Sequence, residues 1–212
     1  MNLRLSTTPD PGPKADDVAG EQQRRYAALD AVRVAVENEA RVRDEAARAS
    51  AARARDAVWC GASLADLAAV TGHSRQAARK RWSGLGDVQR RRGWLGRQTE
   101  GVMWATTQLL SQREALAPTA EAGFDRAVDV LDDAHRRVAA LTSEVDTATT
   151  PAHWHALDDL VDAALRRCVT LAGRPPEATT AAFAVHGAHG VVSYYDHARR
   201  QPDAGAASPG DE

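Results

Sequence analysis

Hydrogen-bonding and cationic side chains are concentrated in one short stretch of this sequence, at Ser74, Arg75, Gln76, Arg79 and Lys80. An arginine can donate two hydrogen bonds to one guanine, and a glutamine amide can pair with the edge of an adenine. If the stretch is helical, Ser74 can cap the helix, and the other four side chains lie on one face. We therefore expect Arg75 and Gln76 to contact bases, with Ser74 beside a base or phosphate. Arg79 and Lys80, one turn later, would contact phosphates.

A second cationic cluster follows at Arg90, Arg91 and Arg92, close to Trp94. One interpretation is a phosphate clamp that adds salt-sensitive affinity without reading sequence. The other is a solvated helix end, where cations are favourable near the C-terminus. The sequence leaves both interpretations open.

The residues around the first cluster predict two short helices joined by a sharp turn. Ser63 and Asp66 have the spacing of a capping box, which would begin the first helix. Gly72 can adopt the positive φ that such a turn requires. Ala68 and Ala78 are small enough for the two helices to cross at close range.

With these features, residues 61–82 resemble the helix-turn-helix DNA-binding proteins of high-GC bacteria, whose motif often reads close to Gly-Ala-Ser-x-x-x-Leu-x-x-x-x-Gly-x-Ser-Arg-Gln-Ala-Ala. The matching positions here are Gly61, Ala62, Ser63, Leu67, Gly72 and residues 74–78. Thr71 and His73 depart from the pattern, because such motifs usually carry aliphatic residues beside the turn glycine. The resemblance implies that residues 74–81 form a recognition helix for the major groove, with Trp82 closing a small core.

The composition predicts an all-α protein. Alanine is abundant, isoleucine is absent, and β-branched runs are rare. No alternating pattern follows the motif, so we expect a tri-helical helix-turn-helix unit without a wing. The expected organisation is a disordered lead-in (1–17), a long Ala- and Arg-rich helix (18–59), the helix-turn-helix unit (54–95), an acidic helical bundle (96–200) and a disordered tail (201–212).

Charge changes sign along the chain. Residues 1–40 contain 5 basic and 7 acidic side chains, residues 41–97 contain 13 and 5, and residues 98–212 contain 9 and 17. The net charges of the three blocks are therefore −2, +8 and −8. A basic middle segment that includes the motif favours contact with a polyanion.

Apolar residues at spacings of three and four predict the helices. The long first helix carries a thin stripe and could form a coiled coil, pack on its own protein, or break near Ser50. Further helices are expected over about 96–114, from Phe124 to Leu141, after Thr150 and Pro151, and over about 177–200. The predicted stripes are Tyr26, Leu29, Val32 and Val36; Val102, Ala105 and Leu109; Phe124, Val128, Leu131, His135, Val138 and Leu141; and Trp154, Leu157, Val161, Leu165, Cys168 and Leu171.

Enzymatic and metal chemistry is disfavoured. Cys60 and Cys168 lack metal or disulfide spacing, and we expect a reducing cytoplasm, without an export signal or membrane span. The pair His186 and His189 is not a specific ligand pattern. Two acidic clusters are expected on solvated helix faces, namely Asp129, Asp132 and Asp133, and Asp158, Asp159 and Asp162. We therefore predict no catalytic residues, cofactor or metal.

The leading hypothesis is a nucleoid-associated transcriptional regulator that binds double-stranded DNA as a homodimer, through the bundle or the long helix. The alternatives are a non-specific architectural, partition or chromosome-organising protein, or a helical protein-interaction module. The acidic bundle could also bind a small-molecule or protein effector. Two glycines that interrupt the last helix place such a pocket near Phe183, Gly187, Gly190 and Tyr194.

Overall fold

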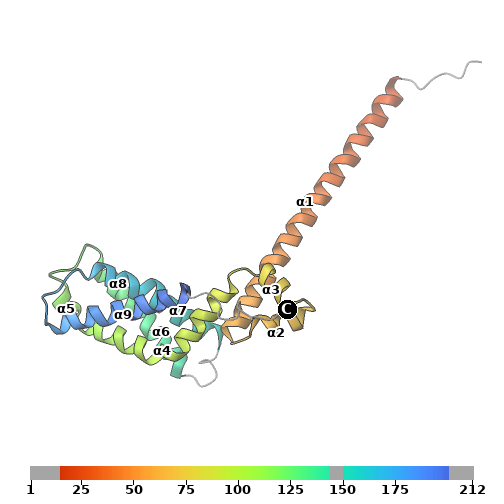
Figure 1. Ribbon diagram of the computed structural model, residues 1–212. Coiled ribbons are helices and arrows are strands. Elements are labelled where there is room, and N and C mark those ends of the chain that lie inside the picture. The colour runs from red at the N-terminus through yellow and green to blue at the C-terminus, as the bar shows by residue number, and fades with distance from the viewer. Residues whose placement is uncertain (1–14, 144–149, 201–212) are drawn as a thin grey trace, which may run out of the picture. The chain divides into compact units, whose positions relative to one another are not determined.

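The computed structural model describes residues 15–143 and 150–200, without the side chains of residues 15–18. Helices make up 85% of these described residues, and no strand occurs in the two ranges, which confirms the all-α class (Figure 1). No helix within them is long and apolar enough to cross a membrane. The predicted tail, residues 201–212, lies outside the described residues, as does the lead-in up to residue 14. Residues 15–17 of that lead-in are helical.

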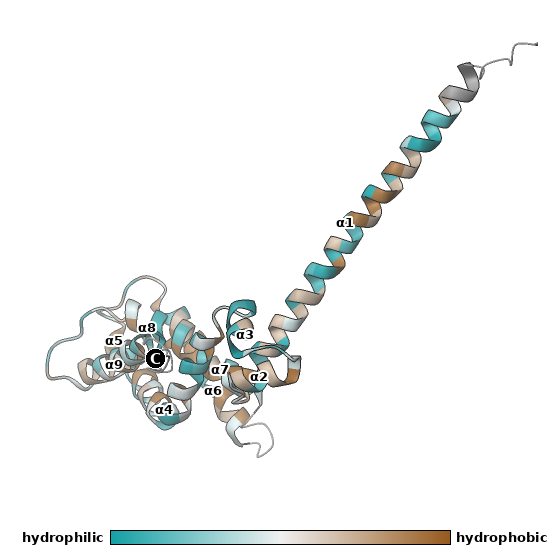
Figure 2. Cartoon of the chain, turned by 45° about the vertical axis from the view of Figure 1, so that its right-hand side comes forward, coloured by the Kyte–Doolittle hydropathy of each residue, from teal (hydrophilic) through white to brown (hydrophobic). Residues whose placement is uncertain are grey.

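Helix α1 (Ala15–Trp59) is continuous, without the break considered near Ser50. The chain divides into two compact units, residues 1–50 and 51–212. In the first unit, α1 exposes more than half of each of Tyr26, Leu29, Val32 and Val36. Figure 2 shows apolar positions interspersed with polar ones along this helix.

The second unit begins with the last turns of α1, followed by α2 (Leu64–Thr71), α3 (Arg75–Arg81) and α4 (Leu85–Ser111). The sequence predicted a helix from about residue 96, but α4 begins eleven residues earlier. Leu85, Val88, Trp94 and Leu95 are buried on α4, and this burial favours one helix through the glycine-containing stretch. The expected boundary between residues 95 and 96 therefore falls inside a helix.

The remainder of the second unit is a bundle. Short helix α5 (Arg113–Leu116) precedes α6 (Phe124–Ser143), which packs against α7 (Pro151–Asp159), the π-helical turn η1 (Leu160–Leu165) and α8 (Arg166–Leu171). The last helix, α9 (Thr180–Arg200), packs along α4.

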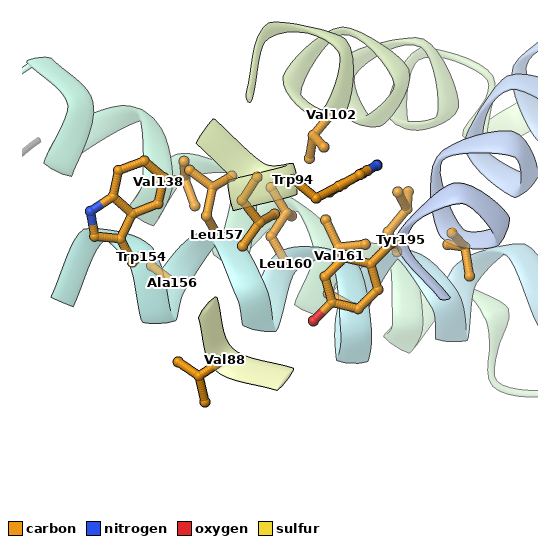
Figure 3. Close-up of a cluster of buried hydrophobic side chains, with 14 of the residues drawn as sticks. Val88, Trp94, Val102, Val138, Trp154, Ala156, Leu157, Leu160, Val161 and Tyr195 are labelled. Carbon is orange, nitrogen blue, oxygen red and sulfur yellow. The ribbon is translucent and has the colours of Figure 1, made fainter. Parts of the chain in front are cut away.

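The predicted apolar stripes form the core of this bundle. Phe124, Val128, Leu131 and Val138 are buried on α6, and all six predicted residues from Trp154 to Leu171 are buried. Leu157, Leu160 and Val161 lie together with Trp94 and Val102 of α4 (Figure 3). As predicted, Thr150 caps α7 by accepting a hydrogen bond from the His153 N–H, with Pro151 in the first turn.

Candidate nucleic-acid interface

Helix α2 begins with the capping box that the sequence predicts. The Ser63 hydroxyl accepts a hydrogen bond from the Asp66 N–H at 3.2 Å, and the Asp66 carboxylate accepts one from the Ser63 N–H at 2.8 Å. The hydrogen bond from the Ser63 N–H and, to a smaller extent, the one from the Ser63 hydroxyl lower the pKa of Asp66. The carboxylate therefore stays charged beside the helix N-terminus, which fixes the start of α2.

The turn from α2 to α3 is built from Gly72 and Ser74. Gly72 has φ +65° and ψ 24°, a left-handed conformation that other residues adopt at a cost. The His73 N–H bonds to the Ala68 carbonyl at 2.9 Å, and the Ser74 hydroxyl accepts from the Ala77 N–H at 3.1 Å. Both predicted roles are confirmed, and together they fix the direction in which α3 leaves the turn.

A small apolar core lies beneath the two helices. Ala78 of α3 is fully buried and Ala68 of α2 is 5% exposed, as expected for small residues between close helices. The other buried members of this region come from the end of α1, from α2 and from the residue that follows α3: Ala54, Val58, Trp59, Leu64, Leu67 and Trp82. The core confirms the expected burial of Trp82.

Outside this core, α3 presents polar side chains to solvent. Ser74, Arg75, Gln76, Arg79 and Lys80 are all exposed. Within the described part of the chain, the side chains of Arg75, Gln76 and Lys80 make no hydrogen bond or ion pair. The structure thus brings the predicted residues together at the start and along one side of a short, capped helix. The donors of Arg75, Gln76 and Lys80 are accessible to a ligand.

The two residues that depart from the family pattern have local roles. Thr71 is exposed, and its hydroxyl donates a hydrogen bond to the Leu67 carbonyl at 2.7 Å. His73 is also exposed, with its Nε2 3.3 Å from an Arg81 guanidinium nitrogen. The Arg81 guanidinium carbon lies 5.4 Å from the Trp82 ring centroid. The Arg81 side chain therefore packs against His73, in the turn between α2 and α3, and against Trp82.

The Arg90 to Arg92 cluster lies in the first two turns of α4 and is only partly exposed. The Arg90 Nε donates to the Arg199 carbonyl at 3.1 Å. The Arg92 Nε donates to the Trp59 carbonyl at 3.3 Å, and its guanidinium lies 3.9 Å from the Trp154 ring centroid. These contacts connect helices, and the cluster lies near the start of α4, so the interpretation as a solvated C-terminal end is wrong. Contact of the three arginines with phosphates stays a prediction.

Arg91 belongs to a buried polar network that the sequence did not indicate. Its side chain is 16% exposed, lies 3.0 Å from the Asp87 carboxylate and donates to Asp158. The Tyr195 hydroxyl donates to the same carboxylate of Asp158. Burial, followed by the neighbouring Asp158, raises the pKa of Tyr195, so its hydroxyl stays protonated and remains a donor.

The expected solvated face is therefore wrong for Asp158, which is 8% exposed. Asp162 is also paired, accepting from Arg166 at 2.9 Å and from Arg199 at 3.0 Å. Arg166 also donates two hydrogen bonds to the Asp196 carboxylate of α9, of 2.9 and 2.6 Å, and these lower the pKa of that carboxyl. Asp158 and Asp162 thus connect helices, whereas Asp159 is exposed as predicted.

The histidines and cysteines do not assemble a metal centre in the part of the chain that is described. No group of three or more His, Cys, Asp or Glu side chains there could hold a metal ion. His153 is buried and His155 contacts the Trp59 ring, with centroids 5.3 Å apart. Cys60 is exposed, Cys168 is buried, and both are free thiols.

Comparison with known protein families, with curated proteins and with solved structures finds no match to this chain. The functional argument therefore depends on the residues themselves.

Proposed function

We propose that the chain is a sequence-specific double-stranded DNA-binding protein, acting as a transcriptional regulator, and that α3 is its recognition helix. The observation that carries the proposal is the exposed row of Arg75, Gln76, Arg79 and Lys80 behind the Ser74 cap. Arg75 and Gln76 would hydrogen-bond to base edges in the major groove. Arg79 and Lys80 would neutralise phosphates.

The well-defined backbone of the α2–α3 turn supports sequence-specific base contacts rather than non-specific electrostatic binding to DNA. Bases are distinguished by hydrogen bonds of defined direction, so a reading side chain needs a backbone that holds its position. The capping box, the left-handed Gly72 and the Ser74 cap supply that backbone. The excess of 13 basic over 5 acidic residues in positions 41–97 adds long-range attraction to DNA.

A single short helix reads few base pairs, and we propose a homodimer that places two copies of α3 about 34 Å apart. The exposed stripe of Tyr26, Leu29, Val32 and Val36 on α1 supports a second copy as the partner. These side chains recur at spacings of three and four, which is the pattern that a two-stranded coiled coil buries. Such a regulator would act in the cytoplasm, on the nucleoid.

Selection of bound duplexes from a random pool, at physiological salt, tests this function. The proposal predicts enrichment of a motif with two related half-sites, and competition by bulk DNA only at a large excess. The second candidate is an architectural protein that binds all DNA, favoured by the arginines exposed along α1, including Arg24, Arg25, Arg41 and Arg48. Binding without enrichment would favour that candidate, and no binding would overturn both.

Replacing Leu29 and Val36 by Arg tests the dimer. Both side chains are exposed within one chain, so the double variant should fold normally but shift the mass measured by light scattering from dimer to monomer. Val34 is 42% exposed and lies off the stripe, so Val34→Arg is the matched control and should remain dimeric. A monomeric wild type, or a dimeric double variant, would exclude α1 as the dimer contact.

A further inference from the structure

A hollow of about 460 Å³ is lined by residues of α4 and α9. These two helices pack against each other along the bundle (Figure 1). Trp94 and Val102 are buried lining residues on α4. On the α9 side, His186, Val191 and Tyr194 line the hollow, and Gly187 and Gly190 between them contribute no side chain. A Cβ added to Gly190 would meet no atom within 4 Å. Glycine destabilises a helix interior, and here its small size leaves this space open.

The chemistry of the hollow indicates what it could hold. Trp94, His186 and Tyr194 offer three rings, and Gln98 offers an amide that can donate and accept hydrogen bonds. No Asp, Glu, Lys or Arg is among the described residues that line it, so a charged ligand would lose its hydration without a partner. The volume falls in the usual range of small-molecule sites.

Exposed aromatic side chains extend the hollow along the same helix pair. Trp104 of α4 is 51% exposed and its ring packs edge-on to Phe183 of α9, with centroids 6.3 Å apart. The Trp104 ring also lies 3.8 Å from where a Cβ of Gly187 would be. Tyr194 is 70% exposed. Large aromatic surface of this kind on one face is characteristic of a binding site.

A chain of contacts leads from the hollow to the core beneath the proposed recognition helix. Trp94 packs edge-on to Tyr195, with ring centroids 5.5 Å apart, and both rings are visible in Figure 3. The Tyr195 hydroxyl donates to Asp158, which also accepts from Arg91. The Arg91 guanidinium lies 5.4 Å from the ring centroid of Trp59, at the end of α1. Trp59 belongs to the same buried cluster as α2 and α3.

From the rings, the neutral lining and this chain of contacts, we infer that the α4–α9 hollow binds an uncharged aromatic small molecule that regulates DNA binding. The regulatory part rests on the proposed function, whereas the binding part does not. The ligand would lie between Trp94 and Tyr194, with hydrogen bonds to Gln98 or His186. Contact of the ligand with Trp94 would shift the Tyr195 ring that packs against it. That shift would change the hydrogen bonds of Asp158 and the position of Arg91 beside Trp59.

Binding is tested on the full chain with N-phenylnaphthylamine, an uncharged aromatic probe whose fluorescence rises in apolar sites. Gly190→Leu fills the hollow, whereas Gly190→Ala makes the same change in helix propensity with little added volume. His189→Leu adds an apolar side chain at an exposed position of α9 outside the lining. Wild type, Gly190→Ala and His189→Leu should bind the probe saturably, and Gly190→Leu should bind it about tenfold more weakly or not at all.

Equal probe binding by Gly190→Leu and wild type would overturn the site. So would a probe signal that disappears as protein concentration rises, because the α4–α9 face would then be covered by a second copy.

Regulation is tested by measuring the affinity for a selected DNA duplex with and without saturating probe. The wild type should change its affinity by about fivefold or more, and Gly190→Leu should not change. Tyr195→Phe keeps the ring beside Trp94 but removes the hydroxyl that binds Asp158, so it should bind probe and lose the effect on DNA. An unchanged wild-type affinity would overturn the regulatory role. Absence of DNA binding would instead overturn the proposed function and leave the fluorescence result standing.

Discussion

Removing the Asp158 carboxylate should destabilise the second unit far more than removing an exposed carboxylate. Breaking a buried ion pair from one side costs about 3–5 kcal/mol, because a charge is left buried without its partner. Arg91 would retain Asp87 at 3.0 Å and is 16% exposed, which places the loss near the lower end of that range. Asp158→Ala should therefore lower the free energy of unfolding by about 3 kcal/mol, which includes the cost of leaving the Tyr195 hydroxyl without its acceptor.

Urea denaturation followed by helical circular dichroism measures this loss. With a slope of about 2 kcal/mol per M, the midpoint should fall by about 1.5 M. Asp129→Ala is the matched control, since Asp129 also pairs with an arginine, Arg113 at 2.7 Å, but is 65% exposed. Its midpoint should fall by less than about 0.5 M, because exposed pairs contribute under about 1 kcal/mol. Equal midpoints for the two variants at unchanged slope would refute the stabilising role assigned to the network.

Two further predictions concern buried titratable groups. Cys60 is exposed and should react quickly with an aromatic disulfide reagent, whereas burial raises the pKa of Cys168 to about 12, so its thiol should react only on unfolding. Two thiols reacting at one fast rate would contradict this. Burial and, to a smaller extent, the positive charge of Arg92 lower the pKa of His153 below its ordinary 6.5. As the pH falls, His153 is therefore protonated in the unfolded chain at a higher pH than in the folded chain. The free energy of unfolding should therefore decrease below about pH 6.5, and His153→Phe should flatten that part of the profile. An equally steep decrease in the variant would contradict the role of His153.

Local signals in the sequence predicted the beginnings and turns of several helices. The capping box of Ser63 and Asp66, the left-handed Gly72 and the cap at Thr150 each depend on residues a few positions apart. The apolar stripes of α6 and of the segment after Thr150 predicted their buried faces for the same reason. The predicted arrangement of side chains on α3 follows from helix geometry once Ser74 begins that helix.

Interactions between distant segments could not be predicted in this way. Arg91 and Asp158 are 67 positions apart, and Tyr195 is 37 positions beyond Asp158, so no local pattern marks the buried network. An Asp-rich helix normally indicates a solvated face, and only the contacting helices reverse that expectation here. The early start of α4 depends on burial of Val88 and Trp94, which outweighs the weak helix propensity of the intervening glycines.

The most direct test of the central claim is the DNA preference of the Arg75→Ala/Gln76→Ala double variant. The assay is competition between the selected duplex and bulk DNA at fixed salt, with Arg136→Ala/Arg137→Ala on α6 as the control that removes two exposed arginines elsewhere. If α3 reads bases, the double variant should lose most of its preference, about tenfold or more, yet still bind DNA weakly, while the control keeps the preference. An unchanged preference and footprint for Arg75→Ala/Gln76→Ala would contradict the assignment of α3 as the recognition helix.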